Sequence, residues 1–531
     1  MGMTREREVM KNNQRGLRAE RPAECGGALL QAAEHQQWAA SCYRKGAGWS
    51  RARLLLVLCV VIALLPACSF QGGERRQMEA QIQVQYPDPP PDYAMLDVPA
   101  IDTETEWKIS NVHDPSIFKD GEMYYLYSTD VKVGGSPGAG IMVRKSADLI
   151  RWEWVGYALE GVPREAADWT GATNLWAPDI AKLGDTYYLY YSASTFGTNH
   201  SYIGVATSAS PEGPWTDQGA VIKTAPGDGP NAIDPNIVRD AQGGYWFVYG
   251  SFFGGIHIAP LDEGTGKLKE EGVGIQIAAR DRATEEGAVE GPYIIYNEDT
   301  GYYYLFVSYD SLYQDYNVRV GRSEQITGPY LDAAGRDMKD VAYRPQYEVG
   351  NKLIGGYRFS AGDGWLAPGH NSVLQDENGA DYLIHHARPE ADKNWMYLHV
   401  RKLVWTADGW PTVSPERYAG EREQDIPEQE LYGDWELVAH AKYMDGIVPS
   451  YKVTLHEDGR AASEYGELSW SYDGKRTLSL SMQEEAADRS VDEPPVEVQV
   501  LAAWDWELKR PTLVFTGLDS EGSALWGKKL P

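Results

Sequence analysis

Polar openings followed by aromatic runs recur five times along the chain. In each unit a short polar or acidic motif leads into an apolar run, then a charged or glycine-containing turn, then an aromatic run. In the first unit Asp114 stands ten residues before Tyr124, an offset typical of a β-hairpin. The five units cover residues 113–130, 177–194, 234–252, 290–310 and 369–387.

A third apolar run follows every hairpin, and a fourth follows several of them. Four strands in a repeated unit are typical of a propeller blade. We therefore predict an all-β protein with a five-bladed β-propeller over residues 105–420. The first strand of each blade lines the central channel of a propeller, so Asp114, Asp234, Glu290 and His370 should converge. A β-sandwich whose repeats merely reflect ordinary hairpins is the alternative.

The N-terminal region has the features of an export signal. Residues 51–68 read RARLLLVLCVVIALLPAC, in which two arginines precede an apolar run that is short for a membrane span. The end of this run resembles a bacterial lipobox, which implies a lipidated Cys68, extracellular location at the cell surface and membrane contact through the lipid anchor only. An ordinary secretory signal is the alternative. We assign residues 1–68 to this signal region, with a start codon placed too far upstream, and residues 69–104 to a flexible, proline-rich tether.

Composition narrows the possible partners and sites. The four cysteines, Cys25, Cys42, Cys59 and Cys68, precede the folded body, which excludes disulfides and cysteine-ligated zinc from that body. The formal net charge of −28 argues against nucleic acid as a partner. The chain is also rich in Tyr and Trp, which suit both strands and surfaces that stack on sugar rings.

After a polar linker at residues 421–430, short alternating runs resume. They predict a small antiparallel β-barrel or sandwich over residues 431–531. Its tryptophans are compatible with carbohydrate binding or with simple core packing: Trp435, Trp470, Trp504, Trp506 and Trp526.

The opening motifs, in order, resemble glycoside hydrolase family 43. They read HDPS, WAPDI, DPN, EGPY and PGHNS, and SFFGGI at 251–256 and VRVGRSEQITGPY at 318–330 resemble its endo-arabinanases more narrowly. The resemblance implies an inverting enzyme that cleaves α-1,5-L-arabinofuranosidic linkages inside plant cell-wall arabinan or arabino-oligosaccharides. Alternatives are an exo-arabinanase, an arabinofuranosidase or a β-xylosidase of this family, a retaining fructan hydrolase, or a non-catalytic glycan-binding propeller.

The resemblance also implies roles for three carboxylates. Asp114 corresponds to the general base, Asp234 to the residue that orients the acid and raises its pKa, and Glu290 to the general acid. Such chemistry needs one ionised and one protonated carboxyl group on opposite sides of the scissile bond. Asp179, in WAPDI, stands at the same phase but is interpreted as structural.

Further residues are candidates for contacts around the three carboxylates. The resemblance places His370 beside a calcium ion in the channel, held largely through waters; a satisfied channel histidine is the alternative. Arg319 and Arg322 are interpreted as structural pair partners. The candidate sugar contacts are His113, Trp176, Phe196, Ser251 and Phe252.

Overall fold

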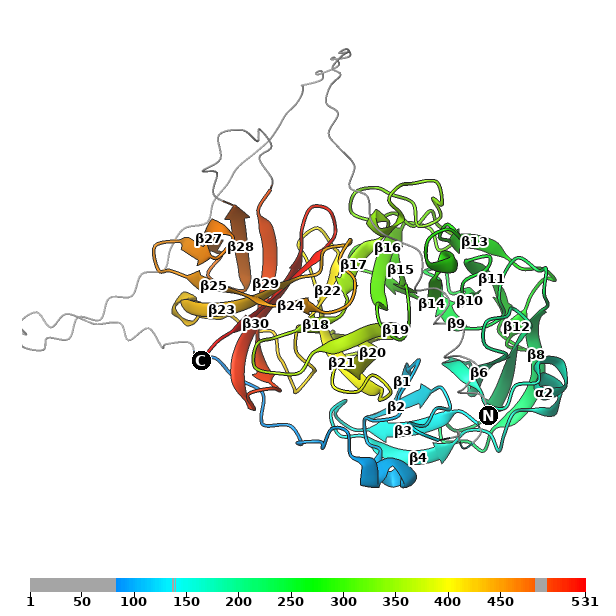
Figure 1. Ribbon diagram of the computed structural model, residues 1–531. Helices are drawn as coiled ribbons and strands as arrows, with labels where there is room; N and C mark the ends of the chain where they lie inside the picture. Colours follow the sequence, from blue (N-terminus) through cyan, green and yellow to red (C-terminus); the bar gives the residue numbers. More distant parts are fainter. Residues whose placement is uncertain (1–82, 136–137, 139, 483–493) are drawn as a thin grey trace, which may run out of the picture. The chain divides into compact units, whose positions relative to one another are not determined.

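The computed structural model describes residues 83–135, 138, 140–482 and 494–531. The prediction of an all-β chain with a five-bladed propeller and a C-terminal β-domain is confirmed (Figure 1). The predicted signal region and Cys68 lie outside the described residues. Within the described part of the chain, no helix combines the length and the apolar character that crossing a membrane requires.

The five blades follow one another along the chain as antiparallel sheets. Blades 1, 2 and 4 each have four strands in sequential order, whereas in blade 3 both β12 and β13 pair with β11. The strands are β1 (Ser116–Asp120), β2 (Met123–Ser128), β3 (Met142–Ser146) and β4 (Glu153–Tyr157) in blade 1; β5 (Trp176–Leu183), β6 (Thr186–Ser194), β7 (Ser201–Ser208) and β8 (Thr216–Thr224) in blade 2; β9 (Asn236–Arg239), β10 (Tyr245–Tyr249), β11 (Ile256–Asp262), β12 (Lys267–Leu268) and β13 (Ile275–Ala278) in blade 3; β14 (Val289–Asn297), β15 (Tyr302–Tyr309), β16 (Asn317–Ser323) and β17 (Asn351–Ile354) in blade 4; and β18 (Tyr357–Arg358), β19 (Trp365–Gln375), β20 (Asp381–Pro389), β21 (Tyr397–Trp405) and β22 (Pro411–Val413) in blade 5.

The first strands of the blades form a closed ring. β1 contacts β5, β5 contacts β9, β9 contacts β14, β14 contacts β19, and β19 returns to β1. The second strand of each blade is largely buried and aromatic, as in MYYLYS of β2 and YYYLFVSY of β15. The aromatic side chains of these strands fill the space between neighbouring blades, where they belong to hydrophobic clusters. The Tyr-rich composition therefore serves mainly as blade packing.

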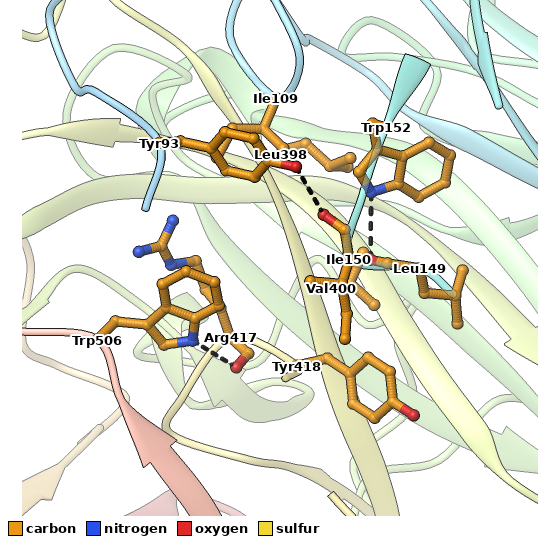
Figure 2. Close-up of a pocket in the computed structure, with 10 residues that line it drawn as sticks. All are labelled: Tyr93, Ile109, Leu149, Ile150, Trp152, Leu398, Val400, Arg417, Tyr418 and Trp506. Atoms are coloured by element: carbon orange, nitrogen blue, oxygen red, sulfur yellow. Dashed lines mark hydrogen bonds between the residues drawn. The ribbon is translucent and has the colours of Figure 1, made fainter. Parts of the chain in front are cut away.

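The ring closes between blades 1 and 5 without any strand shared by the two blades. The segment before β1 instead pairs with the edge of blade 5: Ser110 bridges to Tyr397, the Val112 N–H donates to the Met396 carbonyl, and the Leu398 N–H donates to that of Ile109. A pocket lies at this seam, lined by blade residues together with Tyr93 and Trp506 (Figure 2). Three separate parts of the chain thus meet at the closure.

The predicted flexible tether is wrong for its described C-terminal part. Val84 packs against the barrel core, Gln85 exchanges two hydrogen bonds with Gln424, and the Tyr93 hydroxyl donates to the Ile150 carbonyl. The proline-rich run is extended and its backbone and apolar side chains find partners on both domains, so it is a strap along the body. It ends in two short 3-10 helices, η1 (Val98–Asp102) and η2 (Glu104–Glu106).

The C-terminal domain is a closed antiparallel barrel (Figure 1). Its interior is filled by side chains, among them the buried Trp435, Trp470 and Phe515. Trp504 and Trp526 are buried as well, whereas Trp506 stacks on Arg417 of the propeller. The tryptophans thus pack the core or the domain interface. The barrel strands are β23 (Gly433–Ala439), β25 (Tyr451–Leu455), β26 (Arg460–Ser463), β27 (Gly466–Tyr472), β28 (Thr477–Met482), β29 (Val496–Asp505), β30 (Arg510–Leu518) and β31 (Ala524–Lys529).

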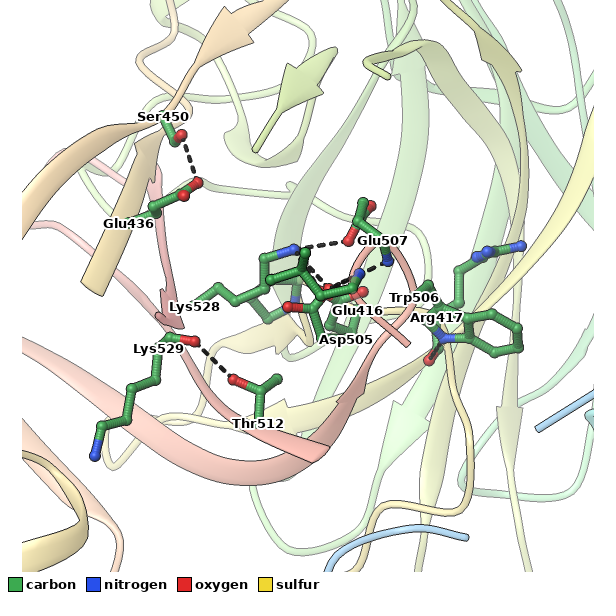
Figure 3. Close-up of polar contacts among 12 residues, drawn as sticks. Glu416, Arg417, Glu436, Ser450, Asp505, Trp506, Glu507, Thr512, Lys528 and Lys529 are labelled. Atoms are coloured by element: carbon green, nitrogen blue, oxygen red, sulfur yellow. Dashed lines mark hydrogen bonds and ion pairs between the residues drawn. The ribbon is translucent and has the colours of Figure 1, made fainter. Parts of the chain in front are cut away.

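The barrel and the propeller belong to one compact unit. Barrel residues of β24 (Val448–Pro449) pair in parallel with β18, which extends the sheet of blade 5. Beside this junction, the buried Lys528 ammonium lies 3.0 Å from Glu416, 2.7 Å from Glu507 and 3.5 Å from Asp505 (Figure 3). The Lys528 pKa is raised because these carboxylates outweigh its burial.

Substitution of this lysine should loosen the domain junction. Lys528→Met would remove the buried cation from Glu416 and Glu507 and leave Asp505 with Arg510 at 3.7 Å, so we expect a loss of about 3–5 kcal/mol in the free energy of unfolding. Thermal or denaturant unfolding of the full chain measures the effect. Lys452→Met is the matched control, because its partner Asp434 and Lys452 itself are exposed and such pairs contribute about 0–1 kcal/mol. Equal losses in the two variants would contradict this view of the junction.

Candidate active site

One unusual backbone conformation recurs on the inner strand of every blade, near the start of β1, β5, β9 and β14 and within β19. Five residues at equivalent positions have positive φ angles: Asp114 (50°), Ala177 (35°), Asp234 (60°), Gly291 (60°) and His370 (48°). Only glycine adopts this left-handed region freely, while Asp and His are tolerated there more readily than most side chains. In blade 4 the glycine occupies the position, and Glu290 precedes it by one residue at a bulge.

Hydrogen bonds from these positions link each blade to the one before it. The Ala177 N–H donates to Thr129 Oγ1 (2.7 Å), that of Asp234 to Ser192 Oγ (3.1 Å), and that of His370 to Ser308 Oγ (2.7 Å). Two links use other acceptors: the Asp114 N–H faces His386 Nδ1 at 3.3 Å, and the Gly291 N–H donates to Asp234 Oδ2 at 3.1 Å. The polar ends of all five inner strands are therefore connected in a ring.

Asp114 is surrounded by groups that favour its ionised form. Its Oδ1 lies 2.7 Å from His113 Nδ1 and 3.0 Å from His370 Nδ1, and Thr129 donates to Oδ2 at 2.5 Å. Burial alone would raise the pKa of this carboxyl, but the two histidines hold it well below its usual range. Asp114 is a buried, hydrogen-bonded carboxylate.

Asp234 and Glu290 have the opposite character. Burial, together with the nearby negative charges of Glu290 and Asp114, raises the pKa of Asp234 to about 8. Burial also raises the pKa of Glu290, whose Oε2 accepts a hydrogen bond of 2.8 Å from Ser251 Oγ. The surroundings thus favour the ionised form of Asp114 and the protonated forms of Asp234 and Glu290, which is the pairing that acid–base catalysis requires.

Histidines cover Asp114. The His113 ring stacks on that of His386 with 3.8 Å between ring centroids, and burial lowers the pKa of both. His370 differs, because Asp114, Asp234 and Glu290 overcome its burial and raise its pKa to about 9. His370 therefore supplies the positive charge that faces the three carboxyl groups.

Asp179 has a structural role, as its interpretation from the sequence required. Its Oδ1 accepts from Ser116 of blade 1 at 2.7 Å, and its Oδ2 accepts from the Ile237 N–H of blade 3 at 2.7 Å. Burial raises its pKa to about 6. Asp179 joins the two neighbouring blades, and its oxygens are occupied by these contacts.

Comparison with known proteins identifies the family. The family model for glycosyl hydrolases family 43 matches residues 109–411, which include all five strand openings. The chain belongs to this family. A second model, described as a C-terminal lipocalin-like domain, matches residues 415–527 and coincides with the barrel.

Relatives share both domains of this family 43 chain. An extracellular endo-α-(1→5)-L-arabinanase of Thermotoga petrophila is 33% identical over 469 residues, or 80% of this chain and 95% of the relative. The extracellular endo-α-(1→5)-L-arabinanase 2 of Bacillus subtilis is 32% identical over 463 residues, with 80% and 94% covered. The crystal structure of an endo-1,5-α-L-arabinanase from Thermotoga petrophila aligns with a TM-score of 0.71 and 31% identity, and covers 80% of this chain and 99% of that one.

The remaining candidates of the family 43 site fall into two groups. Ser251 and His113 are engaged with Glu290 and Asp114, so they hold the carboxyl groups in place. Trp176 and Phe252 are half-buried at the openings of blades 2 and 3. Phe196 is 69% exposed in the loop after β6, which lies at the same end of its blade as the strand openings.

The two arginines of β16 pack within the protein. Arg319 is buried and donates to backbone carbonyls and to Asn317, whereas Arg322 lies over Trp410 at 4.1 Å. Both therefore act as structural partners.

Three residues of the site were missed by reasoning from the sequence. Thr129 could have been found, because it follows β2 at the same phase as Ser192 in β6 and Ser308 in β15. His386 stands at that phase in blade 5, but its role depends on contact with blade 1. Tyr316, whose hydroxyl lies within reach of Glu290, comes from a loop that belongs to no repeat.

Proposed function

We propose that the chain is an inverting endo-hydrolase of α-1,5-linked L-arabinan. The substrate follows from the two-domain relatives that are named endo-arabinanases. The single observation that carries the chemistry is the contrast between Asp114, whose pKa is held low by two histidines, and Glu290, whose pKa is raised by burial. The surroundings of the two groups therefore favour the protonation states that a base and an acid require.

In the proposed reaction, Asp114 accepts a proton from water as the water attacks the anomeric carbon. Glu290 donates its proton to the departing glycosidic oxygen, and the product has inverted configuration. Asp234 accepts a hydrogen bond from the Gly291 N–H, next to Glu290, and in this proposal it orients the acid. Thr129 and His113 keep Asp114 ionised and oriented.

Substrate would reach the carboxyl groups at the end of the channel where the inner strands begin. Trp176, Phe196 and Phe252 are the candidate sugar platforms at this end. The relatives are named as extracellular enzymes, and we propose the same location for this chain. Anchoring through a lipid on Cys68 stays a prediction.

The products formed from linear arabinan test the substrate and the mode of attack. We expect a ladder of arabino-oligosaccharides from the first time point, because an endo-enzyme cuts within the polymer, and inverted anomers in an NMR time course. Arabinose as sole early product would favour an exo-enzyme or arabinofuranosidase. Retained configuration would overturn the proposed roles of Asp114 and Glu290.

Substitution of each carboxylate tests its role. We expect Asp114→Asn and Glu290→Gln to lower kcat/KM on linear arabinan by about 10²–10⁴-fold, the usual contribution of one general acid or base. Asp179→Asn is the matched control, since it sits at the same phase but serves blade packing; it should lower the melting temperature and leave the activity of the folded enzyme within a few-fold. Full activity in Glu290→Gln would refute the assignment of the acid.

The family resemblance also implies calcium, and we propose that His370 contributes to its site. The charge of the channel suits a cation, because His370 faces the carboxyl groups of Asp114, Asp234 and Glu290. Oxygen ligands, which calcium prefers, are few: Nδ1 of His370 is engaged with Asp114, so Nε2 is what this residue could offer. Most ligands would be waters, and binding would displace the proton of His370. The ion would supply positive charge that favours the ionised form of Asp114.

Calcium dependence can be measured apart from activity. Dialysis against a chelator should lower both the melting temperature and the rate on arabinan, and added Ca²⁺ should restore both, since a ligand of the folded state stabilises it. His370→Ala should lose the calcium-dependent shift in melting temperature. The same shift in this variant and in the parent would exclude His370 from the site.

A further inference from the structure

The loop that joins β15 to β16 in blade 4, residues 310–316, carries Tyr316 to the proposed general acid. Tyr316 is 1% exposed, and its hydroxyl lies within hydrogen-bonding reach of the Glu290 carboxyl group. Burial raises the pKa of Tyr316 well above its usual value, so the phenol keeps its proton and acts as the donor. Tyr316 therefore holds the side chain of Glu290 through a directed contact.

The position of this phenol is restricted by close packing. Its ring lies over Gly369, where an added Cβ would come within 2.1 Å of the ring. On another side the His386 ring stands 5.9 Å away, centroid to centroid. Gly369 is thus required for the approach of Tyr316, and blade 5 fixes where its hydroxyl lies.

Two donors from different blades face the Glu290 carboxyl group. Ser251 of blade 3 donates to Oε2 at 2.8 Å, and the Tyr316 hydroxyl of blade 4 lies within reach as a second donor. A glutamate side chain has three rotatable bonds, and an acid must meet the leaving oxygen within hydrogen-bond distance. Loss of one donor would allow other rotamers and reduce the fraction of correctly placed acid.

A buried polar network fastens both ends of this loop. At its start, Asp310 forms an ion pair of 2.6 Å with Arg280, which also donates to the Ala288 carbonyl beside β14. At its end, Asn317 Nδ2 donates to Asp310 Oδ2 at 2.8 Å and to the Asp315 carbonyl at 2.9 Å. These bonds close the loop on itself and leave Tyr316 between two fixed points.

The barrel completes this network. Arg319 Nε donates to Asn317 Oδ1 at 2.6 Å, while Nη2 of the same guanidinium donates to the barrel carbonyl of Lys442 at 3.2 Å. Nearby, Lys352 Nζ of β17 donates to the carbonyls of Ala441 (3.2 Å) and Met444 (2.6 Å). A chain of contacts therefore runs from the barrel segment 441–444 through Arg319 and Asn317 to the loop that carries Tyr316.

We propose that Tyr316 is a positioning residue for the general acid, and that the barrel segment 441–444 fastens the loop that presents it. This inference rests on the acid role of Glu290 in the proposed function. The barrel would then contribute to catalysis by fastening this loop, and this contribution requires no sugar-binding surface on the barrel.

The leaving group separates a positioning role from a merely structural one. A 4-nitrophenolate departs without protonation, whereas the sugar oxygen of arabinan needs the acid. We expect Tyr316→Phe to lower kcat on linear arabinan by about 10–100-fold, a loss typical of a displaced catalytic group, and to lower kcat on a 4-nitrophenyl α-1,5-arabino-oligosaccharide less than 3-fold. Tyr313→Phe, in the same loop but 49% exposed, should leave both rates unchanged.

Glu290→Gln run beside these variants distinguishes the two levels of the argument. Glu290→Gln should lose more kcat on linear arabinan than on the nitrophenyl substrate. If it does so and Tyr316→Phe does not, Tyr316 is not a positioning residue while the proposed function stands. If Glu290→Gln shows no such difference, the acid assignment fails. Equal losses of Tyr316→Phe on both substrates, or no loss on either, would also overturn the inference.

The proposed contribution of the barrel is tested by Arg319→Lys, which keeps the charge but cannot reach Asn317 and Lys442 together. We expect this variant also to lose more kcat on linear arabinan than on the nitrophenyl substrate, by a smaller factor than Tyr316→Phe. Arg322→Lys in the same strand is the matched control, because Arg322 contacts Trp410 and the Asp408 carbonyl instead. Melting temperatures of both variants identify any general loss of folding. Equal effects of Arg319→Lys on the two substrates, or none, would remove the barrel from the mechanism.

Discussion

A left-handed residue on the inner strand of each blade, at its start or within it, is the constraint on which this structure depends. Such a conformation costs of order 1–3 kcal/mol for a residue other than glycine, and it persists only where the surroundings enforce it. Here the same turn lets the backbone N–H of a blade meet an acceptor on the blade before it, as between Ala177 and Thr129. The strain and the inter-blade hydrogen bond occur together, and in three blades the strained residue is itself a functional candidate: Asp114, Asp234 or His370. The contacts that assemble the ring also assemble the site.

The electrostatics of the site follow from unequal surroundings within one buried channel. Asp114 has two histidines and a threonine hydroxyl on its oxygens, so its ionised form is favoured. Burial raises the pKa of both Asp234 and Glu290, and the negative charge of Asp114 adds to the rise in each. The same residue type thus takes opposite protonation states because of its neighbours. Asp179 shows the third possibility, a buried carboxyl whose oxygens are used to join blades.

The barrel supports the propeller through contacts on its outer surface. Large side chains such as Trp435 and Phe515 fill its interior, and the cluster around Lys528 binds it to the end of blade 5. At blade 4 its backbone carbonyls accept hydrogen bonds from the buried Arg319 and Lys352. The N-terminal strap connects both domains on another side, with Val84 on the barrel and Tyr93 on blade 1. These contacts make the accessory domain a support of the propeller.

The sequence by itself determined the repeat, and through it much of the protein. Hairpin spacing, turn residues and alternation are local properties, so the five blades, the barrel and the convergence of Asp114, Asp234 and His370 could be predicted from them. The one-residue offset of Glu290 could not, because a bulge is a matter of pairing between strands. Tertiary structure alone decided the contacts between blades: Tyr316 reaches Glu290 from a loop outside the repeat, and His386 meets Asp114 across 272 residues of chain. The physical reason is that such contacts depend on how the ring closes, which no local pattern encodes.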